Sequence, residues 1–352
     1  MTLRPPSFRS RAALGLTAAA AVGRFELQVC RRCGAVQYPP REACHRCLSV
    51  VLDWHLQSGG AELLSETTLL HSHDEYFRGR LPIRLGLVRL DSGPSAVVFL
   101  DEGVSRAPQR VRVDVRLDKA GQGVLVAFAE GDVVTRTRLF REMSCDPGGR
   151  KVLVTDAATA PGVALVRALV DGGAEIVWAG CGSAAATCGG PEDLLGALEP
   201  VRFVSLDVTS DESAQAAADQ IGSQVDILIN NSETCAGLAR AFVPAMQASS
   251  ASASATDPMM AWVNLLSIDA LTSKAASHSF AQSLRAEMLP AGIRVINVFS
   301  GSEIAPVALA QSIVKALQDG VEDLYPGEVA QDWLTQFRAN PKGLERELTP
   351  DR

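Results

Sequence analysis

The sequence predicts a multidomain chain in which a small metal-binding segment and a β-barrel precede a doubly wound parallel α/β sheet. Two Cys-x-x-Cys pairs, Cys30/Cys33 and Cys44/Cys47, are separated by ten residues. From residue 50 to about 141, short segments alternate apolar and polar residues with a period of two, which is typical of half-buried strands. After residue 150, apolar strands alternate with helical segments, which indicates a parallel sheet covered by helices.

The first segment, residues 1–28, is expected to form a helix at 10–22 and a strand at 24–29 that leads into the cysteines. Arginines before the apolar run 12–23 resemble a secretory signal. The run is too short to span a membrane, and reduced cysteines beginning seven residues later fit the cytosol better. We therefore expect a cytoplasmic protein without membrane association.

The cysteine pairs predict one tetrahedral zinc site in a zinc ribbon, residues 29–49. Four thiolates at about 2.3 Å leave no open coordination position, so the zinc is expected to be structural. Two disulfides or four unrelated core cysteines are the alternative, and they explain the paired spacing less well. The net charge of −7 argues against a ribbon that binds nucleic acid. The remaining cysteines are interpreted as small buried hydrophobic residues: Cys145, Cys181, Cys188 and Cys235.

Residues 50–143 are expected to form the barrel. Strands are predicted at 85–90, 96–100, 111–117 and 124–128, with a hairpin turn at 121–123. Five or so short strands in about ninety residues favour a small closed barrel, of which the OB-fold fits best. A glycine- and proline-containing linker at 144–150 follows.

Residues 151–338 are expected to form a Rossmann-type domain, and 339–352 a C-terminal tail. The predicted strands are 151–155, 175–178, 202–206, 225–229, 262–266 and 293–298. A helix is predicted from about 273 to 289, after a low-complexity loop at 248–258. On this helix Phe280, Leu284 and Met288 recur every four residues, which fits either an ordinary core or a subunit interface.

The cysteine pairs, the Tyr38-Pro-Pro-Arg41 segment between them and the β pattern behind them resemble a family of accessory proteins. These are rubredoxin-like zinc ribbons fused to an OB-fold, which serve acyl-CoA thiolases and lyases. The resemblance implies a thiolase-like partner that holds the nucleophile, with acyl-CoA at the shared interface. Arg78, Arg80 and Arg84 would then offer positive charge to a CoA phosphate, or form an ordinary solvated rim.

The second half resembles the short-chain dehydrogenase/reductase family. The resemblance rests on the βαβ opening, Asn230-Asn231, Val263-Asn264-Leu-Leu-Ser267 and Gly292-Ile-Arg-Val-Ile-Asn-Val298. It implies that Ser267 and Lys274 correspond to the family's catalytic serine and lysine. The positions that would hold a dinucleotide are Thr155, Asp156, Gly162, Asp207 and Asn230.

Several departures from the family pattern indicate that this half neither binds NAD(P) nor uses it to reduce a substrate. The phosphate turn has lost two glycines, to Asp156 and Ala160, and a carboxylate near a pyrophosphate is repulsive. The residue four before Lys274 is Ala270, where the family has its proton-donating tyrosine. Ser267 and Lys274 are therefore expected to be vestigial, with no catalytic and no cofactor-binding residues in use.

We thus expect a non-catalytic zinc-binding subunit of a hetero-oligomeric acyl-CoA enzyme, whose partner performs thiolytic or retro-aldol cleavage or acyl transfer. The reductase-like half would serve assembly and self-association. One alternative is a bifunctional NAD(P)-dependent 3-oxoacyl reductase with a divergent active site. Another is a free-standing scaffold protein.

Overall fold

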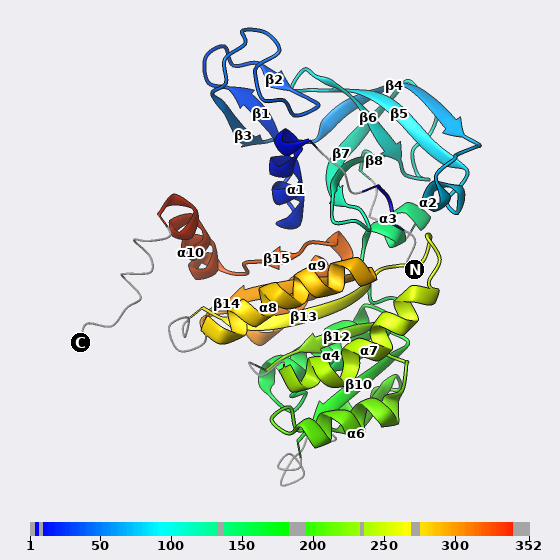
Figure 1. Cartoon of the computed structure of the whole chain (residues 1–352), viewed down its shortest axis with the longest axis vertical. Coiled ribbons are helices and arrows are strands. Elements are labelled where there is room, and N and C mark those ends of the chain that lie inside the picture. Colours follow the sequence, from blue (N-terminus) through cyan, green and yellow to red (C-terminus); the bar gives the residue numbers. More distant parts are fainter. Residues whose placement is uncertain are drawn as a thin grey trace. The chain divides into compact units, whose positions relative to one another are not determined.

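Figure 1 shows the computed structural model, which describes residues 4–6, 10–131, 137–182, 195–232, 236–268 and 275–340. The chain forms two compact units. The first comprises Met1–Ser144, Ala253–Met259 and Asp319–Val321, and the second comprises Cys145–Ser252, Met260–Gln318 and Glu322–Arg352. Within the described ranges, every helix is too short or too polar to traverse a bilayer.

The first unit begins with a helix and the small sheet of the ribbon. The helix is η1 (Arg11–Ala13) continued by α1 (Leu14–Ala21), as the apolar run predicted. Strand β1 (Glu26–Cys30) pairs antiparallel with β2 (Val36–Gln37) on one side and with β3 (Leu52–Leu56) on the other. Because β3 pairs with β1 over its whole length, residues 52–56 lie in the ribbon's sheet and not in the barrel.

The barrel that follows is closed by five strands in the order β4-β5-β6-β8-β7. Their bounds are β4 (Gly60–Leu69), β5 (Ile83–Leu90), β6 (Ser95–Leu100), β7 (Gln109–Leu117) and β8 (Gly123–Ala129). Two short helices, α2 (Glu75–Arg78) and α3 (Arg138–Met143), belong to the same unit. Strands β6 and β8 pair parallel and the other pairs are antiparallel. This arrangement confirms the predicted OB-fold barrel.

The barrel and the N-terminal helix share one apolar core. Alternate residues of the strands point inward, so that Val111, Val113 and Val115 of β7 are all buried. Leu16 of α1 and Leu27 of β1 belong to the same cluster. The helix and lead-in strand are therefore held by burial of apolar surface against the barrel.

The second unit is built on a seven-stranded parallel sheet in the order β11-β10-β9-β12-β13-β14-β15. The strands are β9 (Lys151–Val154), β10 (Ile176–Cys181), β11 (Val201–Ser205), β12 (Ile227–Asn230), β13 (Met260–Ser267), β14 (Ile293–Ser300) and β15 (Asp323–Leu324). The chain reverses direction across the sheet between β9 and β12, which is the switch point of a doubly wound sheet. The predicted Rossmann-type fold is confirmed.

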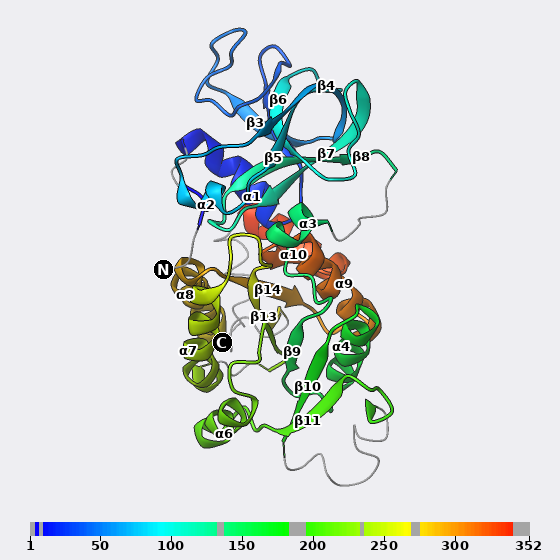
Figure 2. The ribbon, with the colours of Figure 1, turned by 90° about the vertical axis from the view of Figure 1, so that its right-hand side faces the viewer.

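Helices cover both faces of this sheet, as Figure 2 shows. One face carries α6 (Asp211–Ile221), α7 (Ala236–Ser252) and α8 (Ala275–Met288), and the other carries α4 (Ala160–Asp171) and α9 (Pro306–Asp319). Short 3-10 helix η3 (Leu289–Ala291) and helix α10 (Glu328–Ala339) complete the unit. The apolar stripe of α8 lies in the core beneath these helices, where Leu284 and Met288 are buried and Phe280 is partly buried.

Helix α10 was not predicted. Its Trp333 ring stacks 5.9 Å from the ring of Phe299 in β14, and Phe299 in turn stacks 4.9 Å from Tyr325. Ala330 of α10 is fully buried in the same cluster. Aromatic burial on the end of β14 therefore fixes the last helix of the unit.

Candidate metal centre and the carboxyl edge of the parallel sheet

The structure brings the four predicted zinc ligands together at the end of β1. The Sγ atoms of Cys30, Cys33, Cys44 and Cys47 lie within 4.8 Å of one another. The Cys30–Cys47 and Cys33–Cys44 Sγ atoms are each 3.6 Å apart. Four thiolates about 2.3 Å from one ion at the corners of a tetrahedron stand about 3.8 Å apart. The donor set and its spacing therefore fit a single Zn²⁺, and no other such cluster occurs among the described residues.

Both cysteine turns have the same backbone design. The amide of Gly34 donates to the carbonyl of Cys30 over 2.8 Å, and that of Leu48 donates to the carbonyl of Cys44 over 3.0 Å. Gly34 and Leu48 both have positive φ, +69° and +59°. Glycine adopts this conformation freely, whereas leucine is strained in it. The second turn thus holds a strained residue directly after a zinc ligand.

Amides aimed at the sulfur atoms favour thiolate at two of the ligands. Burial raises the pKa of the Cys30 thiol, but hydrogen bonds from the amides of Cys33 and Arg32 outweigh it and bring the pKa to about 6. The pKa of Cys44 is likewise lowered, because the amide of Arg46 and its neighbour outweigh burial. A hydrogen bond from the amide of Ala35 lowers the pKa of Cys33, but burial and the three neighbouring sulfur atoms outweigh it and instead raise that pKa to about 11. Two of the four ligands are thus favoured as thiolates, the form that binds zinc.

Two buried glutamines that the sequence did not single out hold the second turn against the first. Gln28 and Gln37, opposite each other on β1 and β2, are joined by a 2.9 Å hydrogen bond between their side chains. Oε1 of Gln28 accepts from the amide of Arg41, and Oε1 of Gln37 accepts from the amide of His45. Polar side chains in a short strand resemble a solvated face, so only the fold identifies this network.

Of the three arginines considered for a CoA phosphate, Arg80 and Arg84 are engaged within the first unit, whereas Arg78 of α2 is exposed. Arg80 is 4% exposed and forms a 2.6 Å ion pair with Glu142, so it is not a solvated rim. Arg84 pairs with Glu66 and donates over 2.8 Å to the carbonyl of Val104. These contacts leave neither guanidinium group as an open phosphate site.

At the carboxyl edge of the parallel sheet, the structure brings Thr155, Asp156, Gly162 and Asn230 together. Thr155 and Asn230 are buried at the ends of β9 and β12, and their side chains lie 3.3 Å apart in a hydrogen bond. The amide of Asn231 donates to Thr155 Oγ1 over 2.9 Å. The two strands at the switch point are thus tied together where a dinucleotide lies in folds of this type.

The turn between β9 and α4 is closed on itself by its own side chains. Thr159 is the N-cap of α4, and its hydroxyl accepts from the amide of Gly162 and donates to the carbonyl of Asp156. A Cβ on Gly162 would lie 2.4 Å from that carbonyl, so glycine is required there. Asp156, a non-glycine residue, has φ +48°. The turn thus keeps the glycine that its close packing requires, Gly162. The amide of that glycine, at the start of α4, is bonded within the turn to Thr159.

Electrostatics at this edge disfavour an anionic ligand. Burial raises the pKa of the Asp156 carboxyl, and the charge of Asp207 adds to this effect. Two hydrogen bonds from Thr209 lower the pKa of Asp207, which keeps that carboxylate charged. A pyrophosphate at the turn after β9 would meet the Asp156 carboxyl group.

The two positions that the sequence predicts to be vestigial, Ser267 and Lys274, differ in what the structure describes. Ser267 ends β13 and pairs in register with Ser300 of β14, two strands away from Thr155 on the same edge of the sheet. Lys274 and Ala270 lie outside the described residues.

Comparison with known proteins finds one family match. Residues 17–51 match the family model described as "ChsH2, rubredoxin-like zinc ribbon domain". This match bears out the resemblance of the N-terminal segment to such ribbons. No curated protein sequence matches the chain significantly.

Parts of the chain are also similar to solved structures. A short chain dehydrogenase from Burkholderia cenocepacia in complex with NADP is 25% identical, with 58% of this chain and 100% of that chain covered and a TM-score of 0.48. The apo form of LigD from Sphingobium is 18% identical, with 58% and 100% covered and a TM-score of 0.47. The Ltp2-ChsH2(DUF35) aldolase is 22% identical, with 35% and 97% covered and a TM-score of 0.30. The chain is thus similar to a ChsH2-type zinc ribbon over residues 17–51 and to a solved short chain dehydrogenase over 58% of its length.

Proposed function

We propose that the chain is a zinc-binding, non-catalytic subunit of a hetero-oligomeric acyl-CoA enzyme. Its partner is a thiolase-fold subunit that performs thiolytic or retro-aldol cleavage, or acyl transfer. The observation that carries the proposal is the ChsH2-type ribbon at residues 17–51, joined to the barrel through one apolar core.

In this proposal Cys30, Cys33, Cys44 and Cys47 hold a structural zinc ion. When bound, the ion cross-links the two cysteine turns and carries no reaction, because four protein sulfurs leave no open position. The segment between the turns has little secondary structure besides β2, so it depends on the metal and on the Gln28–Gln37 pair for its fold.

The reductase-like half serves assembly and not hydride transfer. Support comes from the carboxyl edge, where Thr159 and Asn231 close the turn and the Asp156 carboxyl group would repel a pyrophosphate. No tyrosine precedes Lys274 by four residues. We place self-association in this half, and acyl-CoA at the interface of the barrel with the thiolase-fold partner.

Co-expression of the chain with genes adjacent to its own tests the proposal. Affinity purification of the tagged chain should recover a thiolase-fold protein whose cleavage or transfer activity falls when the chain is omitted. Recovery of no acyl-CoA enzyme would favour the free-standing scaffold. A purified chain that reduces a 3-oxoacyl thioester with NADH or NADPH would instead establish the bifunctional reductase.

A further inference from the structure

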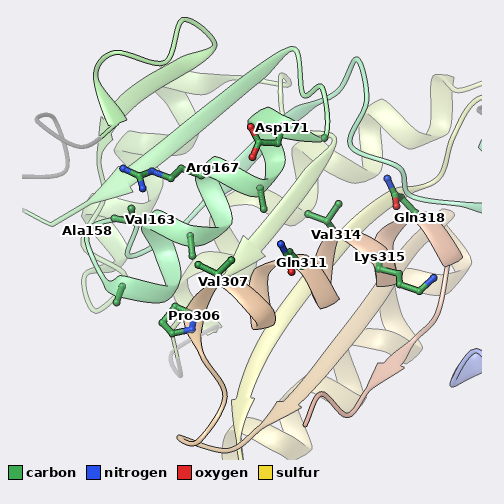
Figure 3. Close-up of a pocket in the computed structure, with 14 residues that line it drawn as sticks. Ala158, Val163, Arg167, Asp171, Pro306, Val307, Gln311, Val314, Lys315 and Gln318 are labelled. Atoms are coloured by element: carbon green, nitrogen blue, oxygen red, sulfur yellow. The ribbon is translucent and has the colours of Figure 1, made fainter.

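A groove of about 940 Å³ runs between α4 and α9 on one face of the parallel sheet (Figure 3). It lies wholly in the second unit, and the proposed function makes no use of it. Its lining consists of Ala158, Ala160, Val163, Ala164, Arg167, Ala168, Asp171, Gly172, Pro306, Val307, Gln311, Val314, Lys315 and Gln318. The volume is at the upper end of the range of small-molecule sites in proteins.

Short side chains on α4 create this space. The helix turns its large apolar residues, Leu165 and Leu169, down onto the sheet, where both are fully buried. The wall that faces α9 carries alanine at three turns of the helix, Ala160, Ala164 and Ala168. Each alanine leaves room that a larger side chain would fill, so the two helices stand apart with an apolar trough between them.

The opposite wall, on α9, combines three apolar residues, Pro306, Val307 and Val314, with Gln311, Lys315 and Gln318. Val307 of α9 is 61% exposed although its neighbour Leu309 is buried. Figure 3 shows Val163, Val307, Gln311 and Val314 lying between the two helices. An exposed valine beside a trough of alanines is apolar surface that a ligand would cover.

The charges stand at the margins of the groove. Arg167 lies on α4 and Lys315 on α9, and both are exposed, while Asp171 is the one carboxylate of the lining. The margins are therefore net positive in a chain whose overall charge is −7. Long cationic side chains can follow an anionic group at the edge of an apolar surface.

We propose that this groove binds an elongated apolar molecule with one anionic end, of the class of long-chain carboxylic acids. The twelve residues of α4 give the trough a length of about 18 Å, which suits an extended hydrocarbon chain. Its lining contains no aromatic ring on which a nucleotide base would stack. Ala158 and Ala160, from the turn after β9, line one part of the groove, and the proposal does not depend on the proposed partner.

The test uses the full chain and a dansyl-labelled undecanoic acid as a fluorescent probe. The probe should bind saturably, and hexadecanoate should displace it while hexadecyltrimethylammonium of equal chain length should not. Affinity should rise along the series octanoate, dodecanoate, hexadecanoate, by up to about fourfold per methylene group where burial is complete. A flat chain-length series, or equal displacement by the cation, would overturn the proposal.

Variants on both walls locate the site. Ala164→Trp on α4 and Val314→Trp on α9 should each lower probe affinity by about tenfold or more. Ala248→Trp, at an exposed position of α7 on the other face of the sheet, is the matched control and should bind as the wild type does. Two variants are made because either one alone could disturb folding, which circular dichroism checks. Equal affinity in folded wall variants and control would refute the location.

Charge variants test the margins. Arg167→Glu combined with Lys315→Glu should weaken probe binding several-fold, and more at low than at high salt. Arg338→Glu, on an exposed cation of α10 outside the lining, should have no effect. If the groove instead receives a second copy of the chain, no probe binds and Ala164→Trp dissociates a dimer in light scattering, which would also overturn the proposal.

Discussion

The side-chain amide of Asn231 donates a 2.8 Å hydrogen bond to Oγ1 of Thr159. This bond joins the residue after β12 to the N-cap of α4, across the position where a doubly wound sheet receives a dinucleotide phosphate. Asn231 also donates to the carbonyl of Asp156, so one amide spans the turn. Because these bonds close the turn, we expect it not to bind a nicotinamide dinucleotide, and a titration can test this.

The wild-type chain should show no saturable binding of NADH or NADPH in a fluorescence titration to about 1 mM, a concentration at which a weak site with about −4 kcal/mol would be half filled. The double variant Asp156→Gly with Ala160→Gly should bind the dinucleotide measurably, at least about fivefold more tightly than the limit of about 1 mM set for the wild type. The reason is that it removes a like charge worth about 1 to 4 kcal/mol and restores close approach of the backbone.

Ala168→Gly is the control, because it places the same flexible residue in α4 away from the turn. It should leave binding undetectable. Micromolar affinity of the wild type for NADH or NADPH would contradict the interpretation that the reductase-like half binds no dinucleotide, whatever the variants do.

The Asp156 carboxyl should make stability fall as pH rises. Burial raises its folded-state pKa above the unfolded value of about 3.9, so the folded state holds the proton more tightly. The cost of burying the charged Asp156 carboxylate is therefore absent below about pH 3.9, and it is complete above the pKa of the folded state. Asp156→Asn, which keeps the shape and tolerates positive φ, should stabilise the chain at pH 7 by no more than about 1 kcal/mol, since the group is half-exposed.

Urea unfolding followed by circular dichroism at pH 7 and at acid pH measures this effect. Asp207→Asn should behave in the opposite way, because hydrogen bonds from Thr209 lower the pKa of Asp207. Its carboxylate contributes stability above the unfolded pKa, and that contribution is lost as pH falls through the folded pKa. Equal effects of both substitutions on the pH profile would show that neither carboxyl group has the environment described.

Cys44→Ser should abolish zinc binding and melt the ribbon while leaving the parallel sheet folded. A structural zinc site of this kind is worth about 10–16 kcal/mol of apparent binding energy, far more than the segment's small sheet supplies. Elemental analysis should find about one zinc per wild-type chain and almost none in the variant. Hydrogen exchange should show lost protection in β1 and β2 and retained protection in β12 and β13.

Cys181→Ser, at a half-buried cysteine of β10 outside the ribbon, is the matched control. It should retain the metal and the protection of β1. Retention of zinc by Cys44→Ser would mean that the metal lies elsewhere.

The zinc ligands, the barrel and the parallel sheet could be read from the sequence because each has a short-range pattern. Paired cysteines require only turns of fixed length. In β7, apolar and polar residues alternate from Val111 to Leu117. The network of Gln28 and Gln37 had no such signal, since its partners are backbone amides thirteen and eight residues away. Long-range satisfaction of buried polar groups is set by the fold.

Two helices show where composition misled the prediction. The run at 248–258 resembles a flexible loop, yet α7 continues through its first five residues to Ser252, because alanine favours helix and Met246 anchors the preceding turn in the core. Helix α10 was missed because its anchoring rings, Phe299 and Tyr325, lie outside the helix. The spacing of Ala330, Trp333, Leu334 and Phe337 is nevertheless that of one helix face, so the sequence did carry a periodic signal for this helix.

The buried pair of Arg80 and Glu142 should be costly to break and nearly neutral to replace. Both side chains are at most 4% exposed, and Arg80 lies between the rings of Tyr76 and Phe99, 5.2 Å and 5.3 Å from their centroids. Glu142→Gln leaves a buried guanidinium without its counter-charge, which should destabilise the first unit by about 3 to 5 kcal/mol. Arg80→Met with Glu142→Leu should recover most of that loss, because an apolar pair needs no desolvation.

Hydrogen exchange of barrel amides in β5 and β6 at increasing urea measures these changes in the unit concerned. The exposed pair of Arg240 and Asp211 is the comparison, since Arg240→Ala should cost less than about 1 kcal/mol. If the double apolar variant were as unstable as Glu142→Gln, the charges themselves would be needed at this position.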